Sequence, residues 1–160
     1  MAKIPVTFTL NDTETALFVD HGANLNEVLR RGAGDLTTKN GCSQGTCGAC
    51  TVLVDGVPHL SCLTLAETME GRKIDTTGGL ANGPDLHPLQ TAFMEGFAAQ
   101  CGFCTAGMLM SAKSLLDKNP NPTRDDVAEA ISGNLCRCTG YEPIIDAILT
   151  AAARAQGRAV

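Results

Sequence analysis

Aromatic residues are scarce in this sequence, which has no tryptophan, one tyrosine and only 4% aromatic residues in all. A chain of 160 residues can form one ordinary domain or two small ones, and small domains with few aromatic anchors often depend on bound metal. Basic residues are not in excess either, since the net charge is −5. Nucleic-acid binding normally requires a clustered basic face, so nucleic acid is not an expected partner.

Long apolar runs are also missing. No stretch approaches the roughly 18–20 apolar residues of a membrane span. The first residues, Met1–Pro5, lead straight into an alternating pattern, without the apolar core of a signal peptide or a twin-arginine pair. We therefore expect a cytoplasmic protein with no membrane insertion. In that reducing compartment, eight cysteines predict metal binding or catalysis rather than disulfide bonds.

The first half of the chain has the period-two alternation of β-strands. Asp55-Gly56 is a strong signal for a tight hairpin turn, and Asn24 is expected to cap a short helix. The predicted strands cover residues 4–10, 15–19, 51–54, 57–61 and 73–77.

The second half has a helical period instead, after a linker rich in glycine and asparagine at residues 78–84. Thr123 and Asp126 have the spacing of a capping box. Four helices are predicted from apolar positions that include Leu89, Phe93 and Phe97, then Met108, Ala112, Leu115 and Leu116, then Val127 and Ile131, then Ile145, Ile148, Leu149 and Ala152. We expect Phe93, Phe97 and Met108–Met110 to be core residues. The sequence thus predicts an α+β protein with a β-rich domain at residues 1–80 and a four-helix domain at residues 81–160.

Four cysteines of the β-rich half have the spacing of plant-type ferredoxins. Cys42, Cys47 and Cys50 form C-x4-C-x2-C, and Cys62 follows after eleven further residues. Each iron of a [2Fe–2S] cluster is tetrahedral and takes two thiolates besides the bridging sulfides, so a single loop must wrap around the cluster. A zinc site or a set of buried thiols is the alternative, and the spacing favours the cluster.

Three glycines are interleaved with these cysteines. Gly41, Gly45 and Gly48 would let the loop curl, adopt positive φ and direct backbone N–H groups at the cluster sulfurs. Such hydrogen bonds also tune the reduction potential.

The other four cysteines lie between the predicted helices. Cys101 and Cys104 form C-x2-C between the first two helices, and Cys136 and Cys138 form C-x-C between the last two. Two helical hairpins would thus bring four thiolates to a shared centre, either a [2Fe–2S] cluster or a structural zinc ion. A redox-active dithiol is a third interpretation, but it leaves two cysteines unexplained.

No other group of residues predicts substrate chemistry on this chain. The eight cysteines divide into four and four, which leaves no spare thiol as a nucleophile. His21, His59 and His87 are isolated in the sequence, and there is no dinucleotide-binding or Walker A motif. We therefore expect no catalytic residue here.

Three longer segments resemble a known family, the small iron–sulfur subunits of the xanthine oxidase family of molybdenum hydroxylases. The resemblance covers nearly the whole chain, in order. The segments are GCSQGTCGACTV at residues 41–52, QCGFCTAGM at residues 100–108 and NLCRCTGY at residues 134–141.

The resemblance implies a ferredoxin-like β-grasp domain followed by a four-helix [2Fe–2S]-binding domain. It also implies that Cys101, Cys104, Cys136 and Cys138 hold the cluster proximal to molybdenum, and that Cys42, Cys47, Cys50 and Cys62 hold the distal plant-type cluster. Gln100 and Cys138 would approach the molybdopterin of a large partner subunit. A medium FAD-binding subunit and a dimer of heterotrimers are further expectations. The implied role is relay of single electrons from molybdenum toward FAD or another acceptor.

Ala106 departs from the family pattern, because proline usually stands at this place in the first turn of the following helix. We expect little cost from the exchange. Two other classes of protein remain open at this point. A free ferredoxin would work as a monomer with several redox partners, and a zinc-stabilised interaction module would be colourless rather than brown.

Overall fold

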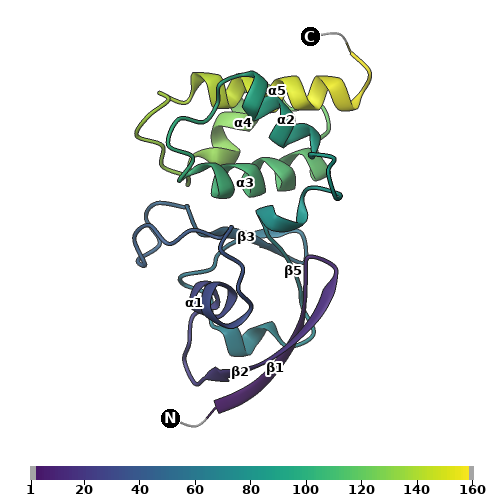
Figure 1. Cartoon of the computed structure of the whole chain (residues 1–160). Coiled ribbons are helices and arrows are strands. Elements are labelled where there is room, and N and C mark those ends of the chain that lie inside the picture. Colours follow the sequence, from purple (N-terminus) through teal and green to yellow (C-terminus); the bar gives the residue numbers. More distant parts are fainter. Residues whose placement is uncertain (1–2, 159–160) are drawn as a thin grey trace.

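The computed structural model describes residues 3–158, which form a β-sheet half and a helical half stacked end to end (Figure 1). The described part of the chain begins at the outer end of the sheet half and ends on the outer side of the helical half. Among the described residues, no helix is both long and apolar enough to cross a membrane.

The first half is built on a mixed five-stranded sheet with the order β2-β1-β5-β3-β4. Strands β1 and β2 pair antiparallel, as do β3 and β4, whereas β1 and β5 run parallel. Both hairpins turn on residues with positive φ, Asn11-Asp12 and Asp55-Gly56, which is the geometry that tight hairpins need. The strands are β1 (Lys3–Leu10), β2 (Thr13–Asp20), β3 (Thr51–Val54), β4 (Val57–Leu60) and β5 (Lys73–Asp75).

A short helix covers one face of this sheet. Asn24 caps it as predicted, since its side chain accepts a hydrogen bond from the N–H of Glu27. The α-helical part, α1 (Leu25–Glu27), continues as a π-helical turn, η1 (Val28–Gly32). The apolar face of this segment, Leu25 and Leu29, is fully buried against β1 and its neighbours. Two 3₁₀ turns complete the half, η2 (Ala66–Met69) and η3 (Thr77–Gly79).

The second half contains four helices, which confirms the predicted architecture. The helices are α2 (Pro88–Glu95), α3 (Thr105–Lys118), α4 (Arg124–Ile131) and α5 (Glu142–Ala155). Their core includes Leu89, Phe93, Met108, Val127 and Ile148, all buried. Helix α3 lies against β3 and β4 and thus joins the two halves (Figure 1).

Phe97 corrects one sequence-based expectation. It was predicted to be a core residue because it continues the four-residue repeat of Leu89 and Phe93. However, α2 ends at Glu95, and Phe97 has a φ of 51° and an 82% exposed side chain. The turn at Gly96 breaks the helical period, so that Ala98 enters the core instead. Phe93 and Met108–Met110 are buried as predicted.

The start of α4 offers a direct test of helix capping. Thr123 and Asp126 form the predicted capping box, in which the Thr123 hydroxyl accepts from the N–H of Asp126 and the Asp126 carboxylate accepts from the N–H of Thr123. Thr123→Ala should cost about 1 kcal/mol of stability, a fall of about 2–4 °C in melting temperature for a chain of this size. Thr123→Ser keeps the hydroxyl and should melt with the wild type. An equal loss in both variants would show that packing of the threonine methyl, not the cap, is responsible.

Candidate metal centres

The first cysteine loop connects η1 to β3 at the end of the sheet half that faces the helices. Cys42 and Cys47 are half-buried, whereas Cys50 and Cys62 are buried. Ser61 ties the ends of the site together, because its N–H and hydroxyl both donate to the carbonyl of Cys50, the hydroxyl at 2.7 Å.

Three of the four thiols belong to this loop, and Cys62 comes from the connection between β4 and η2; together they form two pairs. Cys42 and Cys47 lie close enough to shift each other's pKa, and Cys50 lies close enough to shift the pKa of Cys62. The backbone N–H of Gln44, together with the Thr46 hydroxyl, lowers the pKa of Cys42 to about 6. Two N–H or O–H donors therefore already favour a thiolate at this position, as a metal ligand requires.

Burial has the opposite effect on the pKa of two other thiols of this set. It raises the pKa of Cys47, and together with the neighbouring Cys50 it raises the pKa of Cys62 to about 11. Without a metal these thiols keep their protons at neutral pH. Metal binding here would therefore release protons, and the positive charge of the metal would offset the cost of burying the thiolates.

The predicted loop glycines lie where the chain has little space. Gly45 has a φ of 79°, and a Cβ on it would lie 2.4 Å from a methyl group of Leu63. Gly41 does not have the predicted positive φ, but a Cβ on it would lie 2.9 Å from Sγ of Cys47. Gly48 has a φ of 68° and lies against the helical half, where a Cβ would come within 2.3 Å of the carbonyl oxygen of Gly133. Gly41 and Gly45 thus leave room for the thiol loop, and Gly48 lets it approach the other half of the chain.

The second set of cysteines also forms two pairs, each joining the two helical hairpins. Cys101 and Cys104 come from the α2–α3 loop, and Cys136 and Cys138 come from the α4–α5 loop. The Sγ atoms of Cys101 and Cys138 are 3.7 Å apart, and Cys104 and Cys136 lie close enough to shift each other's pKa. Cys101 and Cys138 are exposed, whereas Cys104 and Cys136 are half-buried.

The environment shifts the pKa values of the two half-buried thiols of this set in opposite directions. Burial and the neighbouring Cys136 raise the pKa of Cys104 to about 12. Burial also acts on Cys136, but the Thr139 hydroxyl, 3.1 Å from its Sγ, and the N–H groups of Cys138 and Thr139 outweigh it and lower the pKa. In the outer pair, the hydrogen bond with Cys101 raises the pKa of Cys138.

Gln100 lies beside the exposed pair. Its side-chain amide donates to the carbonyl of Cys138 at 2.9 Å, which links the two helical hairpins at their exposed tip. Thr139 and Tyr141, which the sequence-based reasoning gave no role, also support this site. The hydroxyl of Tyr141 accepts from the N–H of Cys136 at 3.0 Å. Only their position next to the cysteines could have pointed to them.

The paired arrangement fits two [2Fe–2S] clusters better than two zinc ions. Each iron of such a cluster needs two protein thiolates, whereas a structural zinc ion needs four ligands around one point. Two of the three histidines are engaged elsewhere, with His21 paired to Glu67 at 2.8 Å and His87 capping α2.

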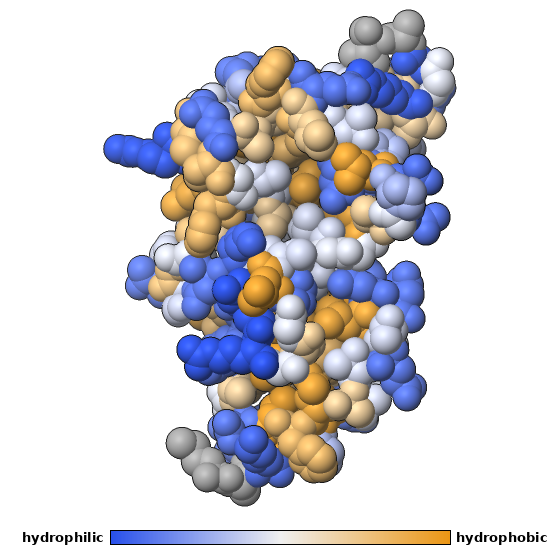
Figure 2. All heavy atoms as spheres, in the orientation of Figure 1, coloured by the Kyte–Doolittle hydropathy of each residue, from blue (hydrophilic) through white to orange (hydrophobic). Residues whose placement is uncertain are grey.

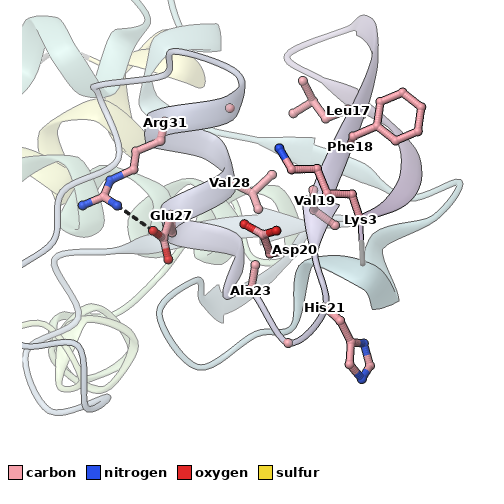
Figure 3. Close-up of a pocket in the computed structure, with 12 residues that line it drawn as sticks. Lys3, Leu17, Phe18, Val19, Asp20, His21, Ala23, Glu27, Val28 and Arg31 are labelled. Carbon is pink, nitrogen blue, oxygen red and sulfur yellow. Dashed lines mark hydrogen bonds and ion pairs between the residues drawn. The ribbon is translucent and has the colours of Figure 1, made fainter. Parts of the chain in front are cut away.

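A concave region of the sheet half contains none of these thiols. This open pocket of about 530 Å³ lies between β2 and the α1–η1 segment (Figure 3). A Glu27–Arg31 ion pair of 2.7 Å crosses its rim, and Phe18 of β2 stands exposed beside it. The cysteines that the sequence predicts as ligands therefore lie outside this pocket.

Two family models match the chain. The model described as "2Fe-2S iron-sulfur cluster binding domain" matches residues 3–95, and the "[2Fe-2S] binding domain" model matches residues 76–149. The two matches overlap at residues 76–95, so they do not fix the domain boundary, and the division at residue 80 stays a prediction. Fold and matches together define a protein with two [2Fe–2S]-binding domains.

Similar proteins narrow this class further. The chain is 48% identical to the nicotine 6-hydroxylase small subunit of Paenarthrobacter nicotinovorans, over 93% of this chain and 90% of that one. It is 43% identical to the xanthine dehydrogenase iron-sulfur-binding subunit of Escherichia coli O157:H7, over 91% and 92% of the two chains. A chain in the crystal structure of quinoline 2-oxidoreductase from Pseudomonas putida 86 superposes with a TM-score of 0.92 at 48% identity, over 99% and 100% of the two chains.

The chain therefore belongs to the family of small [2Fe–2S] subunits of molybdenum hydroxylases, the xanthine dehydrogenase and aldehyde oxidoreductase family. It is the iron–sulfur electron-transfer subunit of a multi-subunit molybdenum oxidoreductase.

Proposed function

We propose that the chain carries electrons one at a time from the molybdenum cofactor of a large partner subunit, first to a proximal centre and then to a distal one. The proximal centre is held by Cys101, Cys104, Cys136 and Cys138, and the distal centre by Cys42, Cys47, Cys50 and Cys62. The observation that carries this proposal is the arrangement of all eight thiols in two sets of two pairs.

The order of the two centres rests on exposure. Gln100, Cys101 and Cys138 are exposed at one tip of the helical half, so a cofactor on another subunit can come close to this pair of thiols. Gln100 would hold the Cys138 peptide in place and turn its remaining polar groups toward the molybdopterin. The thiols of Cys50 and Cys62 are buried and so less accessible to that cofactor.

A second partner would face the distal centre. Leu63 and Leu65, which follow Cys62, are exposed, and apolar side chains also reach the surface over both halves in the view of Figure 2. Exposed leucines beside a cluster loop suit contact with a medium FAD-binding subunit, which would accept the electrons. When bound, each cluster supplies one-electron redox chemistry. The chain itself supplies the thiolates, their spacing and the hydrogen bonds around them, and no catalytic residue for the substrate.

A pull-down of the tagged chain from its native host tests the assembly. We expect a large subunit with molybdopterin and a medium subunit with FAD, in a native mass that corresponds to a dimer of heterotrimers in the cytoplasmic fraction. Recovery of a large molybdopterin subunit without FAD would mean that another group is the final electron acceptor. That result would contradict only the predicted heterotrimer. Recovery of a brown but solitary protein would contradict the fixed-subunit function and favour a free ferredoxin.

A further inference from the structure

The two thiol loops are joined by a backbone hydrogen bond. The N–H of Leu135 donates to the carbonyl of Cys47 at 2.9 Å. Leu135 immediately precedes Cys136, so a single hydrogen bond connects a thiol-bearing residue of the sheet half to one of the helical half. Every other link on this route is a covalent bond. Electronic coupling decays more slowly through covalent and hydrogen bonds than across an empty gap, so this contact provides a bonded route between the two loops.

The side chain of Asn134 stabilises this contact through hydrogen bonds. Its side chain is 3% exposed, and its amide nitrogen donates to the carbonyl of Gly48 at 2.9 Å and to the hydroxyl of Thr51 at 3.2 Å. Its amide oxygen accepts from the hydroxyl of Ser111 at 2.7 Å. Both N–H donors and the oxygen of the amide are thus used, which fixes the orientation of the side chain.

The backbones meet here with no space for adjustment. A Cβ on Gly107 would lie 2.2 Å from the carbonyl oxygen of Gly48. The same carbonyl also accepts from the hydroxyl of Thr51 at 2.7 Å. The Gly48 carbonyl is therefore bound by Thr51 of β3 and by Asn134 of the α4–α5 loop and lies against α3, and the Asn134 side chain bonds both β3 and α3.

We propose that Asn134 is a positioning residue for electron transfer between the two centres. Its buried amide holds the Gly48 carbonyl, one peptide beyond the Cys47 carbonyl that accepts from Leu135, and so keeps the hydrogen bond between the two loops closed. One electron leaves the proximal centre, which is oxidised, and reduces the distal centre, while no proton moves and no covalent bond changes. This inference rests on the proposed assignment of the eight thiols.

The test uses the intact complex and three variants. Asn134→Asp removes both N–H donors and sets a carboxylate against the carbonyl of Gly48. Ser111→Ala keeps those donors but frees the amide oxygen. Ser114→Ala is the matched control, because the hydroxyl of Ser114 also links the two halves, donating to the carbonyl of Gly56 at 3.0 Å, but away from the thiol loops.

The rate of electron arrival at the distal centre is measured by rapid-freeze EPR after mixing with substrate, alongside the spin–spin splitting between the two reduced centres. One buried hydrogen bond corresponds to roughly a tenfold change in an equilibrium, and we expect a fall of that order in the rate for Asn134→Asp. Ser111→Ala should show a smaller fall and Ser114→Ala none, with an altered splitting only in the first two.

The outcomes separate this inference from the proposed function. An Asn134→Asp complex with both EPR signals present but an unchanged rate and splitting would overturn the role of Asn134 and leave the relay intact. If Asn134→Asp loses a centre, Ser111→Ala decides: a slower rate than in Ser114→Ala supports the inference, and an equal rate overturns it. Absence of a second iron–sulfur signal from the wild type would instead reject the thiol assignment itself.

Discussion

Replacing Cys138 with alanine is expected to remove the proximal centre and stop turnover of the complex. Cys138 and Cys101 form the exposed thiol pair, with their Sγ atoms 3.7 Å apart, and loss of either leaves one iron with only one of its two protein ligands. Iron content should fall from about four to about two atoms per chain, since each cluster contains two. Electrons from molybdenum would then lose their first acceptor.

Cys42→Ala is the reciprocal control for this variant. It belongs to the distal set, so it should delete the other of the two reduced-state EPR signals and leave the proximal one in place. In Cys42→Ala the proximal centre should still be reduced by substrate, whereas in Cys138→Ala the distal centre should not. Full turnover by Cys138→Ala with an unchanged reduced-state spectrum would refute the assignment.

Gly48→Ala is expected to be the most destabilising single methyl addition at the contact between the two halves. The left-handed backbone of Gly48 costs about 1–2 kcal/mol for a residue with a Cβ. In addition, the new Cβ would lie 2.3 Å from the carbonyl oxygen of Gly133 and 2.9 Å from Cα of Asn134, which are backbone atoms that cannot move aside cheaply. The two loops must therefore separate or the backbone must deform.

Gly71→Ala is the control that keeps the backbone strain but lacks the steric clash. Gly71 has a φ of 69°, nearly that of Gly48, but nothing lies within 4 Å of its added Cβ. With about 2–4 °C per kcal/mol, Gly71→Ala should lower the melting temperature of the holoprotein by a few degrees, and Gly48→Ala by about 10 °C or more. Gly48→Ala should also increase proteolysis in the linker at residues 78–84. Equal melting temperatures in the two variants would mean that the contact around Gly48 contributes nothing beyond local strain.

Periodicity predicted most of the fold because the buried faces are regular. Val6, Phe8 and Leu10 alternate along β1 and are buried as their pattern indicates, and the Asp55-Gly56 turn joins β3 to β4 as expected. The ends of elements were less predictable. Strand β5 ends at Asp75 rather than at residue 77, and the helix capped by Asn24 becomes a π-helical turn after one turn.

The wrong prediction that Phe97 is buried arose at the turn that follows α2. Phe97 fits the apolar repeat of α2, but nothing in that repeat reveals that the helix ends at Glu95. The alanine at position 106 has a simple structural explanation. It is the second residue of α3, where backbone N–H groups have no partner within the helix, so a proline or an alanine suits the position.

The candidate sites were likewise only partly predictable from the sequence. Spacing along the chain is a local property, and it predicted which cysteines belong to each half. It could not predict which thiols pair, because Cys101 and Cys138 meet only through the packing of α2 to α5. Nor could it predict Asn134, since its hydrogen bond to Gly48 joins residues 86 positions apart and depends on how the two halves dock.

The most direct test of the account is spin and metal counting on the purified chain in its complex. After full reduction with dithionite, we predict about two iron–sulfur spins per chain in two distinguishable EPR signals, with about four iron atoms and about four acid-labile sulfides. A colourless chain that holds zinc in either set of cysteines, or a single signal that accounts for one spin, would contradict the relay through two [2Fe–2S] centres.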